Sequence, residues 1–300
     1  MVLVAVLALI SLPAALVVLE AVSFHARNRS NGVMVSAGYD REYLLHVPRS
    51  YDRTRPTPLV ISMHGGAMWP AAQKETSRWN ELAEREGFIV VYPSGIRGDG
   101  PRHWDADGGP GQPADVQFIS ELIDTLRTRY NIDSTRIYAN GLSNGAGMTF
   151  VLSCELSDRI AAVGLVAAAH FLPFSWCADR RPVPMIAFHG TADLHVRYHG
   201  GKAWMAPYTF PSIPAWTKQW AERNRCAPSA GDSVVAPDVT RRAYAGCADG
   251  AAVVLYTIAG GGHTWPGGGP LPEWFAGRTS SSIDATSEMW AFFSAHRLRN

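Results

Sequence analysis

The sequence lacks an excess of charge of either sign: 27 lysines and arginines stand against 26 aspartates and glutamates, a formal net charge of +1. Proteins that bind nucleic acid need clustered positive charge, so this balance argues against nucleic acid as a partner. The chain also shows no internal repeat and no segment that resembles a separate polymer-binding module. Its 300 residues, 47% of them hydrophobic, suffice for one substantial core, so we expect one main domain.

Cysteine is scarce as well. None of the four cysteines is spaced in the Cys-x-x-Cys pattern that is typical of zinc or redox sites. An even number favours two disulfides in an oxidising compartment, and four buried free thiols are the alternative. Four cysteines allow three pairings, and counting does not choose among them. The four are Cys154, Cys177, Cys226 and Cys247.

The N-terminus is the one long apolar run. Residues 1–19 carry no charged side chain and are long enough for an export signal or a membrane span. Residues 21–23 (Ala-Val-Ser) offer a weak small-x-small cleavage site. Arg27 and Arg29 would keep the following chain in the cytoplasm under the positive-inside rule, but two arginines are a small bias and the cysteines argue for export.

We therefore predict three segments: a signal peptide or N-terminal membrane anchor at residues 1–23, a linker at 24–33, and a folded catalytic domain at 34–300. The protein is expected to be exported, either extracellular or periplasmic, with membrane contact only through residues 1–19. The sequence leaves open whether the first segment is cleaved or retained as an anchor.

Beyond residue 34, strand-like apolar runs alternate with amphipathic runs of helical period. This alternation predicts an α/β fold with a mostly parallel central sheet and helices on both faces. The expected strands are 38–48, 58–63, 88–92, 136–139, 160–169, 183–188 and 251–258, and the expected helices are 73–86, 115–130, 146–156, 215–224 and 283–296.

A serine lies at one of the strand-to-helix junctions, in the pentapeptide Gly141-Leu142-Ser143-Asn144-Gly145. A serine on such a sharp turn has its hydroxyl pushed out of the sheet, with a helix N-terminus beneath it. The flanking glycines suit the close backbone approach that the turn demands. The five-residue pattern alone is weak, because a serine before a helix commonly acts only as an N-cap.

Asp193 and His263 also follow strand-like runs, 183–188 and 251–258 respectively. The chain order Ser, Asp, His is that of α/β-hydrolases. Taken singly, the aspartate suits a turn and the histidine suits an exposed loop. Together, at successive strand ends, they favour a catalytic triad with Ser143 as nucleophile, Asp193 as orienting acid and His263 as general base.

Acyl transfer also needs N–H donors for the oxyanion of the tetrahedral intermediate. The backbone N–H of Asn144, directly after the serine, is the first expected donor. The second is expected from the Gly-Gly turn that follows strand 58–63. We assign it to the N–H of Gly66, with Ala67 as the alternative. The Gly-Gly pair could also be a simple turn at the end of the strand, with no catalytic role.

Three irregular segments lie close to these residues in the sequence: 94–114, 195–214 and 265–282. Residues 94–114 are rich in glycine, proline and aspartate, and loops of this length are usually functional or disordered. Residues 195–214 follow the predicted acid and are expected to form a partial lid. Aromatic side chains in such loops suit a substrate pocket, so Trp104 and Trp265 are candidate substrate contacts.

Four segments of the chain resemble the esterase family that includes polyhydroxybutyrate depolymerases and feruloyl esterases, carbohydrate esterase family one. The resemblance covers most of the chain from about residue 38 onward, and its last two segments are the most specific. It implies an α/β-hydrolase fold and a serine esterase with Ser143, Asp193 and His263 in the roles given above. The segments are 58–66, 141–145, 189–196 and 261–267.

The same resemblance implies the disulfides Cys154–Cys177 and Cys226–Cys247. Many relatives carry a Cys-Trp pair where this chain has His103-Trp104. That departure argues against a disulfide reaching this loop and puts the shape of the acyl pocket in question.

The sequence thus predicts an exported serine esterase that needs no cofactor. Its expected partner is a small or oligomeric ester substrate, such as a hydroxyalkanoate oligomer or a feruloyl or acetyl ester. Two other kinds of protein are compatible with the scaffold: a non-catalytic carbohydrate- or polyester-binding protein, and a serine peptidase or acyltransferase.

A zinc site is the last alternative. Asp193, His195 and His199 are spaced so that they could bind zinc. No glutamate nearby is suited to activate a water, and Asp193 already has a role in the triad. We therefore predict no metal site.

Overall fold

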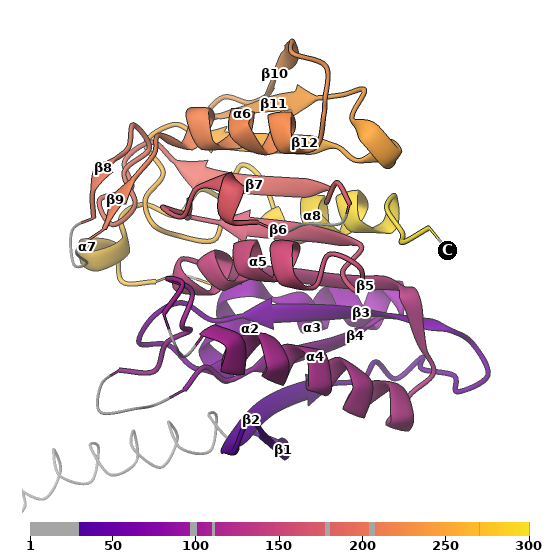
Figure 1. Cartoon of the computed structure of the whole chain (residues 1–300). Helices are drawn as coiled ribbons and strands as arrows, with labels where there is room; N and C mark the ends of the chain where they lie inside the picture. The colour runs from indigo at the N-terminus through magenta and orange to yellow at the C-terminus, as the bar shows by residue number, and fades with distance from the viewer. Residues whose placement is uncertain are drawn as a thin grey trace, which may run out of the picture.

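One ten-stranded sheet, covered by helices on both faces, forms the centre of the molecule (Figure 1). The computed structural model of the chain describes residues 30–96, 101–109, 112–177, 181–203, 208–269 and 271–299. Across the sheet the strand order is β1-β2-β4-β3-β5-β6-β7-β12-β11-β10. The predicted sheet with helices on both faces is confirmed.

The middle of the sheet is parallel and its two sides are antiparallel. Strands β4, β3, β5, β6, β7 and β12 run parallel to one another. Strands β1 and β2 extend one side of the sheet and β11 and β10 extend the other, all by antiparallel pairing. A separate pair, β8 and β9, is antiparallel. The strands are β1 (Gly32–Ser36), β2 (Tyr39–His46), β3 (Thr57–Met63), β4 (Ile89–Pro93), β5 (Ile132–Leu142), β6 (Ala162–Val166), β7 (Met185–Gly190), β8 (Gly201–Lys202), β9 (Thr209–Phe210), β10 (Ala230–Ala236), β11 (Val239–Tyr244) and β12 (Val253–Ile258).

Helices α4, α5 and α6 lie in front of the sheet in Figure 1, and α3 and α8 lie behind it. Two helix starts have clear local causes: Ser212 accepts a hydrogen bond from Ala215 N–H before α6, and Asp284 accepts one from Ser287 N–H before α8. The helices are α2 (Pro70–Ser77), α3 (Trp79–Glu86), α4 (Gln112–Arg129), α5 (Asn144–Glu155), α6 (Ile213–Arg223), α7 (Glu273–Ala276) and α8 (Ala285–Ser294), with single 3₁₀ turns at Phe174–Trp176 and Ala248–Gly250.

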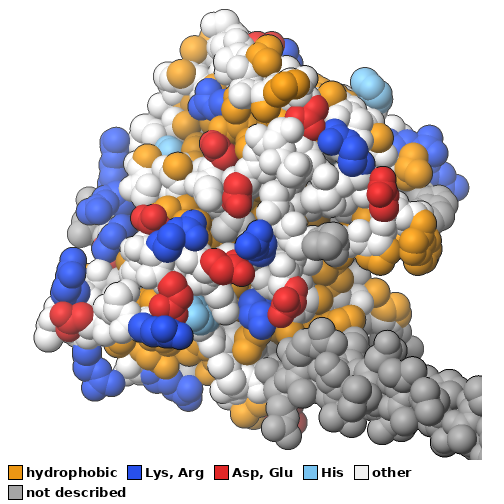
Figure 2. All heavy atoms as spheres, turned by 180° about the vertical axis from the view of Figure 1, so that it is seen from behind, with side chains coloured by type: hydrophobic (Ala, Val, Ile, Leu, Met, Phe, Trp, Pro, Cys, Tyr) orange, Lys and Arg blue, Asp and Glu red, His pale blue; other side chains and the backbone are white. Residues whose placement is uncertain are grey.

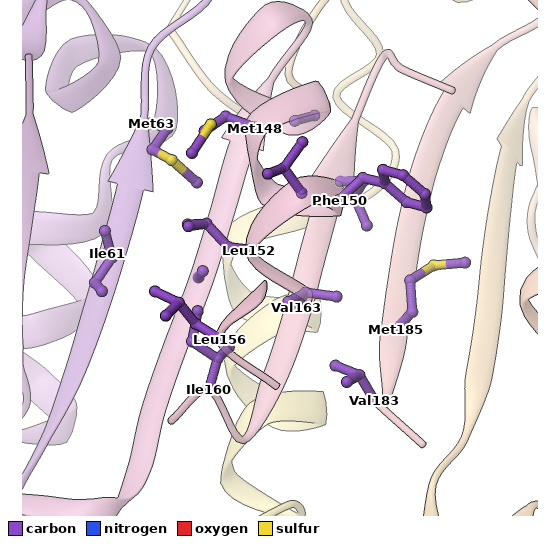
Figure 3. Packing of buried hydrophobic residues seen from close by; sticks show 14 of the residues in the cluster. Ile61, Met63, Met148, Phe150, Leu152, Leu156, Ile160, Val163, Val183 and Met185 are labelled. Carbon is purple, nitrogen blue, oxygen red and sulfur yellow. The ribbon is translucent and has the colours of Figure 1, made fainter. Parts of the chain in front are cut away.

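The hydrophobic core has two layers because each central strand is buried on both faces. Every residue of β3 is buried. Ile61 and Met63 lie in one cluster with Met148 of α5, as Figure 3 shows. Val60 lies in the opposite cluster with Trp79 of α3. Side chains that alternate along a strand point to opposite faces, so an unbroken apolar run is the expected sequence for a strand covered on both sides.

The parallel strands all end at one edge of the sheet, on the left in Figure 1, where β8, β9 and α7 also lie. Ser143 directly follows β5, Asp193 follows β7, and His263 follows β12. Open α/β sheets bind ligands at the carboxyl ends of their strands. The topology therefore delivers the three predicted triad residues to the same edge.

The fold differs from the sequence prediction in several elements, and β1, β8, β9 and α7 are among those not predicted. The helix expected over 73–86 is two helices, because Arg78 adopts a left-handed backbone conformation with φ of 56° and ends α2. The antiparallel hairpin of β10 and β11 was missed. Its sequence signal is a Pro-Asp pair at 237–238 between two β-branched runs.

The predicted N-terminal signal or anchor, residues 1–23, lies outside the described residues. Of the predicted linker, Gly32 and Val33 are already part of β1, where they pair with Tyr43 and Glu42. The linker therefore ends earlier than expected, because its last residues complete a hairpin. No helix in the described part of the chain has the length and apolar character needed to cross a membrane.

Both predicted disulfides are confirmed. Cys154 at the end of α5 is bonded to Cys177, and Cys226 after α6 is bonded to Cys247. None of the four cysteines is adjacent in the sequence to Ser143, Asp193 or His263. The molecular surface carries interspersed acidic and basic side chains on the face seen in Figure 2, in keeping with the near-zero net charge.

Removing either disulfide is expected to destabilise the fold by a similar amount. The two bridges join residues 23 and 21 positions apart, so each removes comparable loop entropy from the unfolded chain. We predict that Cys154→Ser/Cys177→Ser and Cys226→Ser/Cys247→Ser each lower the free energy of unfolding by about 3 kcal/mol. Urea denaturation without reductant measures this, and an unchanged midpoint in either variant would contradict it.

Candidate active site

Ser143 stands on a strained turn between β5 and α5. Its backbone has φ of 54° and ψ of −120°, a conformation that residues other than glycine rarely adopt. The turn is held by the Ser143 N–H, which donates to Val166 O at the end of β6. Strain at this position is typical of a nucleophile that a sharp turn presents at the edge of the sheet.

The two flanking glycines are required by space. A Cβ on Gly141 would lie 2.3 Å from the carbonyl carbon of Gly145, and a Cβ on Gly145 would lie 2.4 Å from the carbonyl oxygen of His64. Both neighbours are backbone atoms and not movable side chains. A larger residue at 141 would push the turn apart at Gly145, and a larger residue at 145 would push the turn away from the end of β3. The pentapeptide thus follows from the backbone packing around Ser143.

Asp193 and His263 meet in a short hydrogen bond. The Nδ1 of His263 lies 2.7 Å from Oδ2 of Asp193. Because the carboxylate only accepts, Nδ1 carries the proton and Nε2 of the neutral imidazole is left as a base. His263 is 7% exposed and Asp193 is 3% exposed, so this pair is largely shielded from water.

The Asp193 carboxylate is surrounded by donors. Its Oδ1 accepts from the backbone N–H groups of His195 and Val196 at 2.8 and 2.9 Å, and its Oδ2 lies 3.3 Å from Nε2 of His189. Burial by itself raises the pKa of Asp193, but the charges and hydrogen bonds of His263 and His189 outweigh it, and the pKa lies well below its usual range. The carboxylate therefore stays ionised and available to hold the imidazole.

The hydroxyl of Ser143 makes no hydrogen bond within the described residues, to His263 or to any other group. Nucleophile and base commonly tighten into contact only when a substrate is bound. The structure thus brings together the acid and the base, and places the serine at the same sheet edge. The transfer of a proton between Ser143 and His263 stays a prediction.

The predicted oxyanion donors differ in their availability. Asn144 is the first residue of α5, so its N–H has no acceptor within the helix, and the helix dipole favours negative charge there. Ala67, the alternative second donor, is ruled out in this structure because its N–H donates to Arg102 O at 2.7 Å. The N–H of Gly66 makes no backbone hydrogen bond within the described residues, which leaves Gly66 as the predicted donor.

A buried histidine holds the loop that carries Gly66. Nε2 of His64 accepts from the N–H of Gly95 at 2.9 Å, so Nδ1 carries the proton and donates to Gly65 O at 2.8 Å. Burial lowers the pKa of His64 to about 4, against an opposing hydrogen bond to Gly65. His64 is thus a neutral side chain that holds the loop by two hydrogen bonds. Its position at the end of a strand did not predict this structural role.

Trp104 is a structural link and not an exposed substrate contact, which corrects the prediction. Its ring is 1% exposed and its Nε1 donates to His64 O at 3.0 Å. Its backbone N–H and carbonyl pair with the side-chain amide of Asn144 at 2.7 and 3.0 Å. Trp104 therefore joins the turn of Ser143 to the loop of Gly66 through its hydrogen bonds to Asn144 and His64.

Trp265 is likewise buried, so this second predicted substrate contact is also corrected. The ring is 0% exposed, and Nε1 donates to the hydroxyl of Thr286 at the start of α8 at 2.9 Å. It packs with the core behind the sheet. The aromatic character of its loop reflects core packing and not a surface for ligand.

The loop that carries Trp104 is held by hydrogen bonds, with no cysteine involved. The N–H of Asp105 donates to the buried carboxylate of Asp115 at 2.9 Å, and that carboxylate is paired with Arg41 of β2 at 2.5 Å. Burial raises the pKa of Asp115, while Arg41 opposes that shift. The ion pair and this hydrogen bond therefore tether the loop to β2 and α4.

The segment predicted to form a partial lid contains the β8–β9 pair, and residues 204–207 between them lie outside the described residues. Tyr208 donates to Asp107 at 2.9 Å and stacks on Phe171 with ring centroids 4.2 Å apart. The segment is thus attached to the loops that follow β4 and β6. Whether it acts as a lid stays a prediction.

No group of three or more potential ligands in the described part of the chain is arranged to hold a metal ion. Of the three residues considered for zinc, Asp193 is engaged by His263 and His195 directs its Nε2–H to Phe275 O at 3.0 Å. These contacts are the ones expected when Asp193 orients His263 as an acid–base pair, with His195 holding the neighbouring loop.

Two of the buried histidines, His64 and His170 in the loop after β6, give a pH prediction. Burial lowers the pKa of His64 and of His170 to about 4, so the unfolded chain binds more protons than the fold between pH 6.5 and 4. The free energy of unfolding should therefore fall as pH drops through this window, by up to roughly 3 kcal/mol for each imidazole. Urea denaturation at pH 7, 5.5 and 4 should show a shallower fall for His170→Gln, while His199→Gln, at an exposed position, keeps the wild-type slope. Equal slopes for all three proteins would contradict this.

Comparisons with known proteins agree with this site. A family model described as "Esterase PHB depolymerase" matches residues 41–174. Feruloyl esterase B of Piromyces equi is 32% identical over 230 residues, which cover 74% of this chain and 42% of that protein. The bifunctional acetylxylan esterase/xylanase XynS20E of Neocallimastix patriciarum is 29% identical over 226 residues, 73% of this chain and 31% of that protein. The chain therefore spans less than half the length of these two relatives.

Two further comparisons cover most of this chain and most of the other protein. The solved structure titled "Acetyl xylan esterase from Aspergillus awamori" superposes with a TM-score of 0.59 at 17% identity, covering 85% of this chain and 94% of that one, and confirms the α/β-hydrolase fold. The putative esterase NocK of Nocardia uniformis subsp. tsuyamanensis is 30% identical over 258 residues, 78% of this chain and 73% of that protein. Together with the family model, this match shows that the chain belongs to the esterase family of the polyhydroxybutyrate depolymerase type.

Proposed function

We propose that the protein is a serine esterase that hydrolyses carboxylic esters through an acyl-enzyme. The observation that carries the proposal is the 2.7 Å hydrogen bond between His263 and the buried Asp193, at the same sheet edge as the strained Ser143 turn. A buried, ionised carboxylate that fixes one histidine tautomer is what a general base requires. Membership of an esterase family supports the same reading.

In the acylation step, Nε2 of His263 takes the hydroxyl proton of Ser143 as Oγ attacks the ester carbonyl carbon. Asp193 stabilises the imidazolium that forms and does not itself take up the proton. The imidazolium then gives the proton to the leaving alkoxide as the carbon–oxygen ester bond breaks. The products of this step are the alcohol and the Ser143 acyl ester.

The negative charge on the carbonyl oxygen is held by the N–H groups of Asn144 and Gly66. One such donor contributes roughly 3–4 kcal/mol to the transition state. The α5 N-terminus adds a favourable dipole at the same point. In deacylation, water replaces the alcohol, His263 takes its proton, and the acid is released while Ser143 recovers its hydrogen.

The substrates we propose are small or oligomeric carboxylic esters, with acetyl, feruloyl and hydroxyalkanoate groups as the candidates. Named relatives are feruloyl and acetylxylan esterases, which supports the first two classes. Export to an oxidising compartment is part of the proposal and is supported by the two disulfides. A non-catalytic binding protein and a peptidase or acyltransferase are the alternatives that the following experiments exclude.

Ser143→Ala is expected to abolish ester hydrolysis while leaving the fold intact, since the side chain makes no hydrogen bond within the described residues. Release of free acid should be measured on p-nitrophenyl, feruloyl and 3-hydroxybutyrate esters, with circular dichroism as the check on folding. Ser233→Ala, at an exposed position on β10, is the matched control and should keep full activity. A fluorophosphonate probe should label the wild type and not Ser143→Ala. Near-wild-type turnover by Ser143→Ala would overturn the proposal, and an unlabelled, inactive wild type would favour a binding protein.

Asp193→Asn tests the acid. An amide at this position can donate to Nδ1 and so favour the wrong tautomer of His263, which is expected to lower kcat roughly ten-thousand-fold. The matched control is Asp232→Asn, which changes an exposed aspartate paired with Arg242 on the surface. A loss of kcat of less than tenfold in Asp193→Asn would show that this carboxylate does not orient the base.

A further inference from the structure

Helix α7 is attached directly to the loop of the proposed base. The backbone N–H of His263 donates to Ala276 O at 2.6 Å, and the N–H of Gly262 donates to Arg278 O at 2.9 Å. The contact is close enough that a Cβ on Gly262 would lie 2.1 Å from Ala276 O. The position of α7 is therefore fixed relative to the His263 imidazole by backbone bonds.

The side chain of His195 makes a second connection between His263 and α7. Its ring lies against the His263 ring, with centroids 4.6 Å apart, and equally close to the ring of Phe275. Its Nε2 is 3.0 Å from Phe275 O. A continuous row of contacts thus runs from the imidazole of His263 through His195 to the aromatic residues of α7.

The outer face of α7 is apolar and open to solvent. Trp274 is 87% exposed and Phe275 is 40% exposed, while Leu194, beside the proposed acid, is 67% exposed. Trp274 is the one fully exposed tryptophan among those that the structure describes; Trp104 and Trp265 are buried. A large apolar side chain left in water next to a binding site is a typical contact for a ligand.

The chemistry of the proposed reaction decides which part of a substrate reaches α7. His263 must give its proton to the leaving alkoxide, so the alcohol portion of an ester lies beside the imidazole. The acyl portion lies beside Ser143 and the oxyanion donors. Because α7 is bonded to the His263 loop, the alcohol portion is the part of a substrate that lies nearer to α7.

We propose that Trp274, supported by Phe275, is the residue that binds the alcohol portion of the substrate when that portion is a sugar ring, as the names of the acetylxylan esterase relatives suggest. The inference rests on the esterase function proposed above and adds to it a residue that determines leaving-group specificity. The slightly positive C–H face of a sugar ring suits the negative face of an exposed indole. The adjacent Glu273 is exposed as well and supplies carboxylate oxygens that accept hydrogen bonds from sugar hydroxyls.

The test compares two esters of one acid that differ only in the alcohol. The acid, acetic or ferulic, is the one that the wild type releases faster, offered as its methyl ester and as its xylo-oligosaccharide ester. Trp274→Ala should lower kcat/KM about tenfold on the sugar ester, mainly through KM, and change the methyl ester by less than twofold. Trp274→Phe, which keeps an aromatic face, should recover most of the loss.

Tyr39→Ala is the matched control, because Tyr39 is an aromatic residue, 52% exposed, on the β1–β2 hairpin at the other side of the sheet from β12. It should leave both esters unaffected. Equal losses on both esters, or no loss on the sugar ester, would overturn the inference while the esterase function stands. A loss confined to a 3-hydroxybutyrate trimer would overturn the choice of a sugar. A wild type that hydrolyses neither ester and takes up no fluorophosphonate would instead refute the esterase function.

Discussion

The site depends on one buried carboxylate. Asp193 is placed by β7, accepts two backbone N–H groups of its own loop, and faces two imidazoles, His189 and His263. Its charge is costly to bury unless it is fully paired, so the loop must close around it in one arrangement. That arrangement also places the ring of His195 against the ring of His263, and the His195 ring in turn contacts Phe275 of α7. The need to pair the buried Asp193 carboxylate thus fixes the position of His263 and of the neighbouring loop that contacts α7.

The oxyanion side of the site is held in another way, by neutral groups. His64 clamps its own loop between Gly95 and Gly65, and Trp104 joins that loop to the side chain of Asn144. The N–H of Ala67 donates to Arg102 O, which leaves Gly66 as the proposed second oxyanion donor. These contacts cost nothing to reorganise during a reaction, because the donors are fixed before any substrate arrives. The strain at Ser143 is sustained by the same tight backbone packing, in which Gly141 and Gly145 leave no room for a side chain.

The parts of the prediction that succeeded rest on local patterns. Apolar runs of strand length marked β3, β5, β7 and β12, and the polar residue after each run lies at the carboxyl edge because parallel strands end together. The break of the expected helix at Arg78 could not be foreseen, since an arginine in the left-handed region is tolerated only where surrounding packing imposes it. The two tryptophans were misjudged for a related reason: an aromatic residue in an irregular loop serves equally well as core or as surface.

The sequence by itself determined the order of the central parallel strands and of the main helices between them, the identity of the residues at the ends of these strands, and the presence of enough cysteine for two disulfides. Each of these follows from neighbours within a few positions. Only the tertiary structure decided that Trp104 and Trp265 are buried, that Ala67 is engaged, and that Trp274 stands exposed beside the proposed base. Those outcomes depend on contacts between segments far apart in the chain, such as Trp104 with His64 and with Asn144. Burial and hydrogen bonding are properties of such contacts, and no local pattern of residues encodes them.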